Sequence, residues 1–440
     1  MKLLLTLFIC SLASAVSGQH LNTQKMDSLF TVIENENQGM GNIAILKEGE
    51  LIYSLAYGMS EVESEKKANT ETIYRIGSIS KTFTATLIML AVEENGLLKL
   101  DDKLSKYYPQ FENSDNITIE HLLRHKSGLY NFTNSPDYPT YMTKELGKDE
   151  LLAIMAEGGS SFPPGEKFEY SNTGYVLLSY ILEDVYQKPY AAILKEKIIL
   201  PLQLKRTAFG EEIETRNNEA NSYRRSGRWE KLPETFMKIP MGAGAITSTA
   251  TETSIFFHKL LKGDIVSEAS LDNMKAMENN FGIGMFNMPF NEKMAIGHNG
   301  GIDGFQSVSA YFPEEQLSFT ILSNGVKYPL NNVLIGALSI YFNVPYKIPE
   351  FQKEIVLLPE QIQPYTGIYS SKTFPLKITI SLDGTQLTGQ ATGQPSFPLS
   401  AESANTFSFD PAGLKISFDA EKRTLELNQM GNSFILTKED

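Results

Sequence analysis

The sequence predicts an α+β fold, in which an antiparallel sheet is flanked by helices and joined to a helical region, followed by a small all-β barrel. Three observations lead to this prediction. Apolar strands on either side of a turn make Ile43 to Tyr57 typical of a β-hairpin. Two more strand patterns, Gln306 to Tyr311 and Leu317 to Leu322, follow a long stretch from about Ser78 to Leu261 that is mostly helical and loop-like. A sheet built from both ends of one domain, with helices between, is an α+β arrangement.

The N-terminal segment 1–18 has the pattern of a cleaved signal peptide. Lys2 precedes an apolar stretch through Phe8, and small residues follow up to Gly18. The single cysteine, Cys10, lies inside this segment, so the mature chain would contain none. Such a chain fits an exported bacterial protein, periplasmic or secreted, that folds without disulfides. Beyond this segment, no apolar stretch approaches the roughly 18 residues that a membrane span requires.

Composition argues against several function classes. The formal net charge is −13, and no basic cluster occurs beyond Arg224 and Arg225 near Arg228, which disfavours a nucleic-acid partner. Of the five histidines, only His121 and His125 share helical i,i+4 spacing, and they lack a His-Glu-x-x-His context. No metal or other cofactor is therefore expected. The chain also has no Gly-x-Ser-x-Gly motif, which disfavours an α/β-hydrolase.

The first elements of the mature chain follow from local patterns. Residues 20 to 40 are expected to form an opening helix. The hairpin that comes next turns at Lys47-Glu48-Gly49-Glu50, which separates two apolar strands.

A nucleophile motif, Ser78-Ile79-Ser80-Lys81, opens the next helix. Residues three apart share one helix face, so Lys81 can reach the hydroxyl of Ser78, which is a poor nucleophile without such a neighbour. The free N–H groups of a helix N-terminus also suit an anionic intermediate. A second copy, Ser64 to Lys67, lies in a charged run typical of a solvated loop. Ser78 is thus a candidate nucleophile, and an N-cap serine is the alternative.

A second candidate segment is Phe168 to Asn172, which follows Pro163-Pro164-Gly165 and opens another amphipathic helix. Tyr170 can act there as a general base or proton relay, and the Asn172 amide can bind a substrate carbonyl. A capping turn with a packed tyrosine explains the same residues.

The third segment is Gly297-His298-Asn299-Gly300-Gly301, expected at the end of a strand through Ile296 and before a strand that starts at Gly304. Glycines let a strand pass close to a ligand, and a free N–H there would complete an oxyanion hole with that of Ser78. The alternative is a glycine-rich turn carrying a surface histidine.

The sequence pattern changes in the C-terminal part, where short strands replace the mixture of helices and strands. A linker is expected at 346–357, and the region 358–440 contains short alternating strands such as Lys377 to Ile380 and Leu414 to Phe418. These predict a small, lipocalin-like β-barrel. No acid, base or nucleophile constellation stands out there, so a packing or binding appendage is expected.

In this order, the three segments resemble the serine β-lactamase and penicillin-recognising hydrolase superfamily. The branch concerned contains class C β-lactamases, D-alanyl-D-alanine carboxypeptidases, D-aminopeptidases and related esterases. The segments Ile119 to Leu129 and Gly242 to Ala250 support the resemblance, which covers roughly residues 25 to 345 and implies a hydrolase domain at 19–345.

The resemblance implies a role for each matching position. Ser78 would be the acylated nucleophile, with Lys81 and Tyr170 as its proton-handling partners and the order of proton transfer left open. A Lys81 cation would lower the pKa of Tyr170, whereas burial would lower that of Lys81. The remaining positions would contact the substrate: the side chain of Asn172, the wall formed by His298, Asn299 and Gly300, and the oxyanion-hole N–H groups of Ser78 and Gly301.

One departure from the family bears on the substrate. Many members place Lys-Thr-Gly where this chain has His298-Asn299-Gly300. Lysine is cationic and attracts the carboxylate of a β-lactam, whereas histidine is mostly neutral at pH 7. The expected function is therefore an exported serine hydrolase of small-molecule or peptide substrates, most of all D-amino-acid peptides or cell-wall fragments. A carboxylesterase, a class C-like β-lactamase, and a penicillin-binding or sensor protein with little turnover are the alternatives.

Overall fold

The computed structural model describes residues 21–94, 96–351, 355, 357–384, 386–409, 412–429 and 431–439. The signal peptide expected at 1–18 lies outside these ranges. In the part of the chain that is described, none of the helices has both the length and the apolar character needed to cross a membrane.

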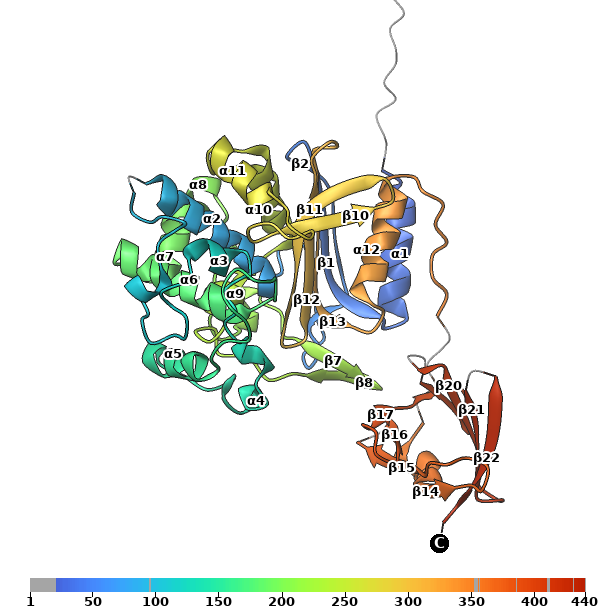
Figure 1. The fold of residues 1–440 in the computed structure, drawn as a ribbon. Helices are drawn as coiled ribbons and strands as arrows, with labels where there is room; N and C mark the ends of the chain where they lie inside the picture. The colour runs from blue at the N-terminus through green and yellow to red at the C-terminus, as the bar shows by residue number, and fades with distance from the viewer. Residues whose placement is uncertain are drawn as a thin grey trace, which may run out of the picture.

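An antiparallel sheet built from both ends of residues 21–345 organises this part of the chain (Figure 1). At its centre, β1 (Gly39–Lys47) pairs with β13 (Leu317–Val326), so that Ile43 faces Ile321. The predicted α+β fold is confirmed, as is the predicted hairpin. In the order of the sheet, the strands are β10 (Phe286–Phe290), β11 (Lys293–Ile302), β12 (Phe305–Phe312), β13 (Leu317–Val326), β1 (Gly39–Lys47) and β2 (Glu50–Tyr57), with the hairpin β7 (Tyr223–Ser226) and β8 (Arg228–Lys231) attached to β13.

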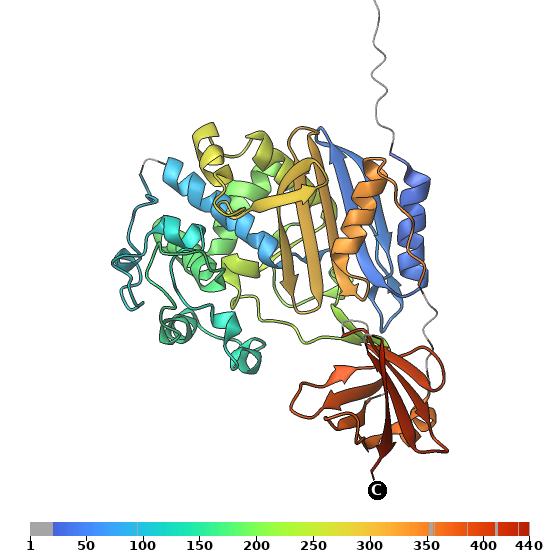
Figure 2. The ribbon, with the colours of Figure 1, turned by 45° about the vertical axis from the view of Figure 1, so that its right-hand side comes forward.

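The sheet separates two apolar cores. Side chains of a strand alternate between its faces, and β1 sends Ile43 and Ile45 into one core and Ala44 and Leu46 into the other. Helices α1 (Thr23–Asn35) and α12 (Leu330–Tyr341) cover the first face, and the helical region lies on the second (Figures 1 and 2). Because both faces are covered, β1 is buried from Gly39 to Leu46.

The helical region is centred on α2 (Ser80–Glu93), which packs against α6 (Asn172–Tyr186) and α9 (Met241–Gly244). The Thr84 hydroxyl of α2 donates to the carbonyl of Gly242 at 2.6 Å, which satisfies a buried polar group and ties α2 to α9. Between α2 and the sheet, Phe83 stacks on Phe256 of α10 (Ala250–Lys262) with ring centroids 3.6 Å apart. The helix that follows Ser78 is therefore fixed on several sides.

Shorter elements complete this part of the chain. They are β3 (Met59–Glu61), β4 (Lys66–Lys67), β5 (Tyr74–Arg75), β6 (Ala208–Phe209), β9 (Ile246–Ser248), α3 (Ile119–Leu123), α4 (Tyr138–Tyr141), α5 (Lys148–Glu157), α7 (Tyr190–Leu194), α8 (Leu200–Leu202) and α11 (Glu268–Lys275). The small sheet β5-β9-β6 interrupts the stretch that was expected to be helical and loop-like. It matters for the site because β5 leads directly into Ser78.

The C-terminal strands form a nearly closed antiparallel barrel, which confirms the predicted all-β barrel. Its strands follow chain order around the barrel, and β14 (Gly367–Ser370) pairs with both β15 (Ile378–Asp383) and β22 (Asn432–Lys438). The interior is filled by apolar side chains such as Ile416, Leu425 and Leu436. After α13 (Pro359–Ile362), the strands are β14 (Gly367–Ser370), β15 (Ile378–Asp383), β16 (Gln386–Ala391), β17 (Phe397–Pro398), β18 (Ser400–Ala401), β19 (Thr406–Phe409), β20 (Leu414–Asp419), β21 (Thr424–Gln429) and β22 (Asn432–Lys438).

We predict that Leu87→Ala lowers the free energy of unfolding by about 2–5 kcal/mol, because a fully buried leucine on α2 leaves a cavity when it is truncated. Leu51→Ala is the matched control: this leucine of β2 is 49% exposed, so the same truncation should cost less than about 1 kcal/mol. Urea unfolding followed by the fluorescence of Trp229, the single tryptophan of the chain, checks both values. Equal losses for the two variants would contradict the described packing of α2.

Candidate active site

Ser78 lies on the 3-10 turn η1 (Gly77–Ile79), immediately ahead of α2 rather than on the first turn of the α-helix. Gly77 has a φ of +52°, and a Cβ atom there would lie 2.8 Å from the backbone nitrogen of Gly301. Glycine suits this left-handed conformation and close approach because it has no Cβ atom. The turn therefore sets Ser78 against strand β11.

The Lys81 side chain is fully buried beside Ser78. Its Nζ atom donates to Ser78 Oγ at 3.0 Å and to the carbonyl of Ala243 at 2.7 Å, and it lies 4.9 Å from the centre of the Tyr170 ring. Burial holds the pKa of Lys81 well below its usual value, because desolvation disfavours the charged form. A neutral amine in this position can accept the serine proton.

The ring of Tyr170 lies beside Lys81, whose Nζ atom is 4.9 Å from the ring centre. Burial raises the pKa of Tyr170, and the neighbouring Ser78 side chain offsets only part of the rise. In the resting site the pKa of Tyr170 is therefore set by burial rather than by a Lys81 cation, and the expected lowering of the Lys81 pKa by burial is confirmed. Desolvation is the larger effect on the phenol, and it also discharges the amine beside it.

His125 supports Tyr170, and the sequence analysis did not identify it as a site residue. The two rings stack with centroids 4.3 Å apart, and the backbone N–H of Ser171 donates to His125 Nδ1 at 3.2 Å. The backbone N–H of Glu169 donates to the carbonyl of His125 at 2.9 Å. Burial keeps the pKa of His125 well below its usual value, so the ring is neutral. In the sequence, His125 was noted only as part of the segment Ile119 to Leu129 that supports the resemblance. A stacking contact between residues 45 positions apart leaves no local sequence pattern that could have identified it.

Asn172 begins α6 and faces the loop before α4. Its backbone N–H donates to Asn131 Oδ1 at 3.0 Å, and its Nδ2 atom donates to Thr133 Oγ1 at 2.9 Å. One of the two amide hydrogens is thus engaged within the protein. Asn131 and Thr133 orient the Asn172 side chain, and sequence reasoning missed both.

Strand β11 runs through His298-Asn299-Gly300-Gly301 and ends at Ile302, so the predicted strand end at Ile296 is wrong. A Cβ atom on Gly300 would lie 2.2 Å from the carbonyl oxygen of Ile76 and 2.9 Å from the nitrogen of Ser78. Gly300 therefore lets the strand stay paired with β12 while it passes directly beside η1. The backbone nitrogens of Ser78 and Gly301 thereby lie on facing segments.

His298 is 4% exposed, so the alternative of a surface histidine on a turn is also wrong. Its ring lies 6.5 Å from that of Tyr170 and 5.1 Å from that of Phe286, measured between centroids. Burial, followed by the charge of Lys81, lowers the pKa of His298 to about 3. The wall opposite Tyr170 therefore carries a neutral imidazole at physiological pH.

The eight predicted site residues thus lie on three separate segments, which are η1 with α2, the start of α6 with the residues just before it, and β11. The second copy, Ser64 to Lys67, begins in the turn after β3 and ends with β4, and Ser64 is exposed to solvent. Within the described ranges, no group of three or more histidine, cysteine, aspartate or glutamate side chains is placed to hold a metal ion.

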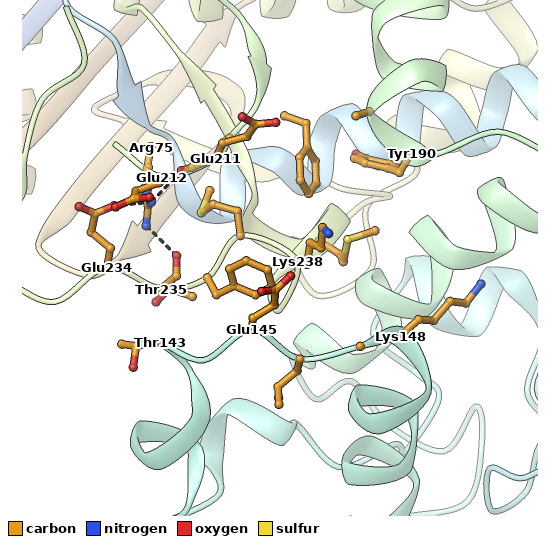
Figure 3. Close-up of a pocket in the computed structure, with 18 of the residues that line it drawn as sticks. Arg75, Thr143, Glu145, Lys148, Tyr190, Glu211, Glu212, Glu234, Thr235 and Lys238 are labelled. Atoms are coloured by element: carbon orange, nitrogen blue, oxygen red, sulfur yellow. Dashed lines mark hydrogen bonds and ion pairs between the residues drawn. The ribbon is translucent and has the colours of Figure 1, made fainter. Parts of the chain in front are cut away.

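A cavity of about 1110 Å³ lies next to these residues without including Ser78 (Figure 3). It shares one wall residue, Arg75, with the strand that leads to Ser78, and another, Met241, with the helix whose Ala243 carbonyl holds Lys81. Charged side chains such as Glu145, Glu211, Glu234 and Lys148 line it together with apolar ones.

Comparison with known proteins places this geometry in a family. The profile of the beta-lactamase family matches residues 32–336. Penicillin-binding protein 4* of Bacillus subtilis is 28% identical over an alignment of 358 residues that covers 74% of this chain and 77% of that protein. Protein flp of Staphylococcus aureus (strain MW2) is 28% identical over an alignment of 323 residues that covers 69% of this chain and 64% of that protein.

Two solved structures share the fold. D-amino acid amidase from Ochrobactrum anthropi SV3 aligns with a TM-score of 0.64 and 23% identity over 73% of this chain and 99% of its own. The octameric penicillin-binding protein homologue from Pyrococcus abyssi aligns with a TM-score of 0.66 and 24% identity over 95% of this chain and 100% of its own. At these identities, the likeness shows the fold alone.

We predict that His298 makes the protein lose stability in acid. Its pKa is about 3 in the folded chain against about 6.5 unfolded, so between these values only the unfolded chain binds the proton. Stability from this residue is complete above pH 6.5 and falls as the pH drops toward 3. In urea unfolding followed by Trp229 fluorescence, wild type should lose up to about 1.4 kcal/mol per pH unit more than His298→Gln in this window. Parallel pH profiles for the two proteins would refute a neutral, buried His298.

Proposed function

Because the chain belongs to the beta-lactamase family of serine hydrolases, we propose that Ser78 is its nucleophile and that D-amino-acid amides or peptides are its substrates. The observation that carries this proposal is the 3.0 Å contact between Ser78 Oγ and the buried amine of Lys81. A serine hydroxyl becomes an effective nucleophile when a base of lowered pKa takes its proton.

Acylation follows from the positions of these groups. Ser78 Oγ attacks the substrate carbonyl carbon while its proton passes to the Lys81 amine, whose new charge is stabilised by the carbonyl of Ala243. The N–H groups of Ser78 and Gly301 stabilise the resulting oxyanion. The phenol of Tyr170 then gives a proton to the leaving amine or alcohol and regains one from Lys81, and the carbon–leaving-group bond breaks.

Deacylation reverses the proton path. A water molecule attacks the acyl carbon, and Lys81, neutral again, takes the water proton directly or through the Tyr170 phenol. The oxyanion forms in the same N–H pair, and its collapse releases the acid and returns the proton to Ser78. No metal or cofactor is needed for either half-reaction.

Two features of the walls support the substrate class. Neutral His298 offers a hydrogen bond and no fixed charge, which suits an amide or an ester better than a free carboxylate. Beside it, three half-buried rings form a row: Phe286 lies 5.1 Å from His298, Phe281 lies 5.6 Å from Phe286, and Phe168 stacks on Phe281 at 4.2 Å. This row suits an apolar or aromatic side chain, as in the amides of the D-amino acid amidase relative.

A carboxylesterase is the second candidate. It would use the same nucleophile and the same proton path, and the apolar row of Phe168, Phe281 and Phe286 also fits a short acyl chain. The two candidates differ only in the bond that is cleaved fastest.

We further propose that the protein is exported, periplasmic or secreted, on the basis of the leader pattern at 1–18. The hydrolase domain would occupy 19–345, the linker 346–357 and the barrel domain 358–440. The barrel has its own buried core, which supports its assignment as a separate unit.

We predict that Ser78→Ala lowers turnover at least about 10³-fold and leaves the fold intact, because it removes the attacking oxygen. Ser64→Ala is the matched control, since Ser64 belongs to the exposed second Ser-x-x-Lys copy, and it should keep wild-type turnover. Ester and amide hydrolysis, with circular dichroism of each variant, checks both. Activity within a few-fold of wild type in Ser78→Ala would refute the nucleophile.

We predict that D-phenylalanine amide is hydrolysed at least roughly tenfold faster than its L-enantiomer, as kcat/KM. Faster turnover of p-nitrophenyl acetate than of any D-amide would favour the carboxylesterase.

Intact-mass measurement with a penicillin, together with the concentration of remaining drug, should detect little adduct and little drug loss, because His298 carries no charge that would attract the drug carboxylate. A lasting adduct would mean a penicillin-binding protein with little turnover, and drug loss without an adduct would mean a β-lactamase.

A further inference from the structure

A buried ion pair connects the two segments that carry the proposed oxyanion-hole nitrogens. Arg75 of β5 stands three residues before Ser78, and Asp303 stands two residues after Gly301. Arg75 Nη1 donates to Asp303 Oδ2 at 2.8 Å, and the two side chains are 2% and 0% exposed. Charge-assisted hydrogen bonds in such a dry setting are short and strong.

Both ends of the pair are fixed by further contacts. The other oxygen of Asp303 accepts from the backbone N–H of Thr235 at 3.0 Å and from its hydroxyl at 2.7 Å. The guanidinium of Arg75 also donates to the carbonyls of Thr235 and Glu211 and to the Glu234 carboxylate, at 2.9, 3.0 and 3.1 Å (Figure 3). The pair is therefore held within the segment that walls the adjacent cavity.

The glycine contacts between η1 and β11 limit how closely the segments approach, but they do not hold them together. Gly77 and Gly300 have no side chain that could anchor one segment to the other. A side-chain hydrogen bond to this region comes from the neighbouring strand β12, where Ser307 Oγ donates to the carbonyl of Ile76, the residue before η1, at 2.8 Å. The separation of the two N–H groups thus depends on Ser307 and on the pair Arg75–Asp303.

We propose that Arg75 and Asp303 are positioning residues that set the spacing of the Ser78 and Gly301 N–H groups and thereby the rate of acylation. This inference rests on the proposed function of Ser78. An oxyanion hole acts through donors held at the place where charge develops, and a displacement of about 1 Å can cost about 100-fold in rate. The pair touches no reacting atom and acts through the backbone on either side of it.

The test compares Asp303→Asn with Lys293→Met. Asp303 has a φ of +54°, a conformation that asparagine tolerates well, so the substitution removes the charge and leaves the turn strainless. Lys293 forms a partly exposed ion pair with Glu315 at the start of β11, the strand that Asp303 follows, so it is the control for the loss of an ion pair away from the site. Single-turnover acylation by the best ester or amide substrate, KM, and affinity for phenylboronic acid, a tetrahedral analogue that forms on the serine, are measured for each variant, together with Tm.

Asp303→Asn is expected to acylate about 10- to 100-fold more slowly and to bind phenylboronic acid more weakly by a similar factor, with KM within a few-fold of wild type. Lys293→Met should keep wild-type acylation even if its Tm falls. Acylation within twofold of wild type in Asp303→Asn, or an equal loss in Lys293→Met, would overturn the proposal.

If Asp303→Asn does not fold, Thr235→Val decides, since it removes only the hydroxyl bond to Asp303 and should slow acylation a few-fold. Unchanged acylation in Thr235→Val would then overturn the proposal. Ser78→Ala is measured in parallel: if it retains turnover, the nucleophile assignment fails, whereas an inactive Ser78→Ala beside a fully active Asp303→Asn refutes the positioning pair alone.

Discussion

The buried amine of Lys81 is the constraint on which the rest of this structure depends. Taking an ammonium out of water costs several kcal/mol, and here its two partners are the Ser78 hydroxyl and the Ala243 carbonyl. Such an arrangement survives only inside a large core that fixes α2, α6 and α9 against one another. Thr84 is another buried polar residue of α2, and it is uncharged: its hydroxyl is satisfied by a hydrogen bond to the carbonyl of Gly242. Burial of Lys81 therefore has two effects. It makes the charged amine energetically unfavourable, and, by lowering the pKa, it leaves a neutral amine that can act as a base.

Backbone contributes as much to the candidate site as side chains do. Gly77 and Gly300 let a strand and a helix-leading turn approach to distances that a Cβ atom at either position would prevent. A Cβ atom at Gly300 would lie 2.2 Å from the carbonyl oxygen of Ile76. The N–H groups of Ser78 and Gly301 can therefore face each other only because residue 300 has no side chain. The glycines allow β11 and η1 to approach closely, but they have no side chains that could hold the two segments together. The buried charges of Arg75 and Asp303 supply the attraction that the glycines lack.

The parts of this molecule that were predictable from sequence are those with a local pattern. The hairpin from Ile43 to Tyr57 and the Ser78–Lys81 pair follow from periods of two and of three to four residues, and both fold classes of the chain were recognised in this way. The errors arose where tertiary contact overrides the pattern. Glycines usually end a strand, yet β11 continues through them because β12 pairs with it on one side and η1 leaves room on the other. The stacking of His125 on Tyr170 and the pair Arg75–Asp303 were missed because they join residues 45 and 228 positions apart.

The shifts around Ser78 also bear on which group takes the first proton. Burial lowers the pKa of Lys81 and raises that of Tyr170, so desolvation favours the neutral form of both side chains. A phenol of raised pKa is a poor base in the resting enzyme, whereas the neutral amine is a good one. Once Lys81 is charged, its field favours loss of the phenol proton, which is the moment when the leaving group needs one. We infer that Lys81 acts first and Tyr170 second, and that the neutral rings of His125 and His298 help by adding no charge to oppose the transient cation.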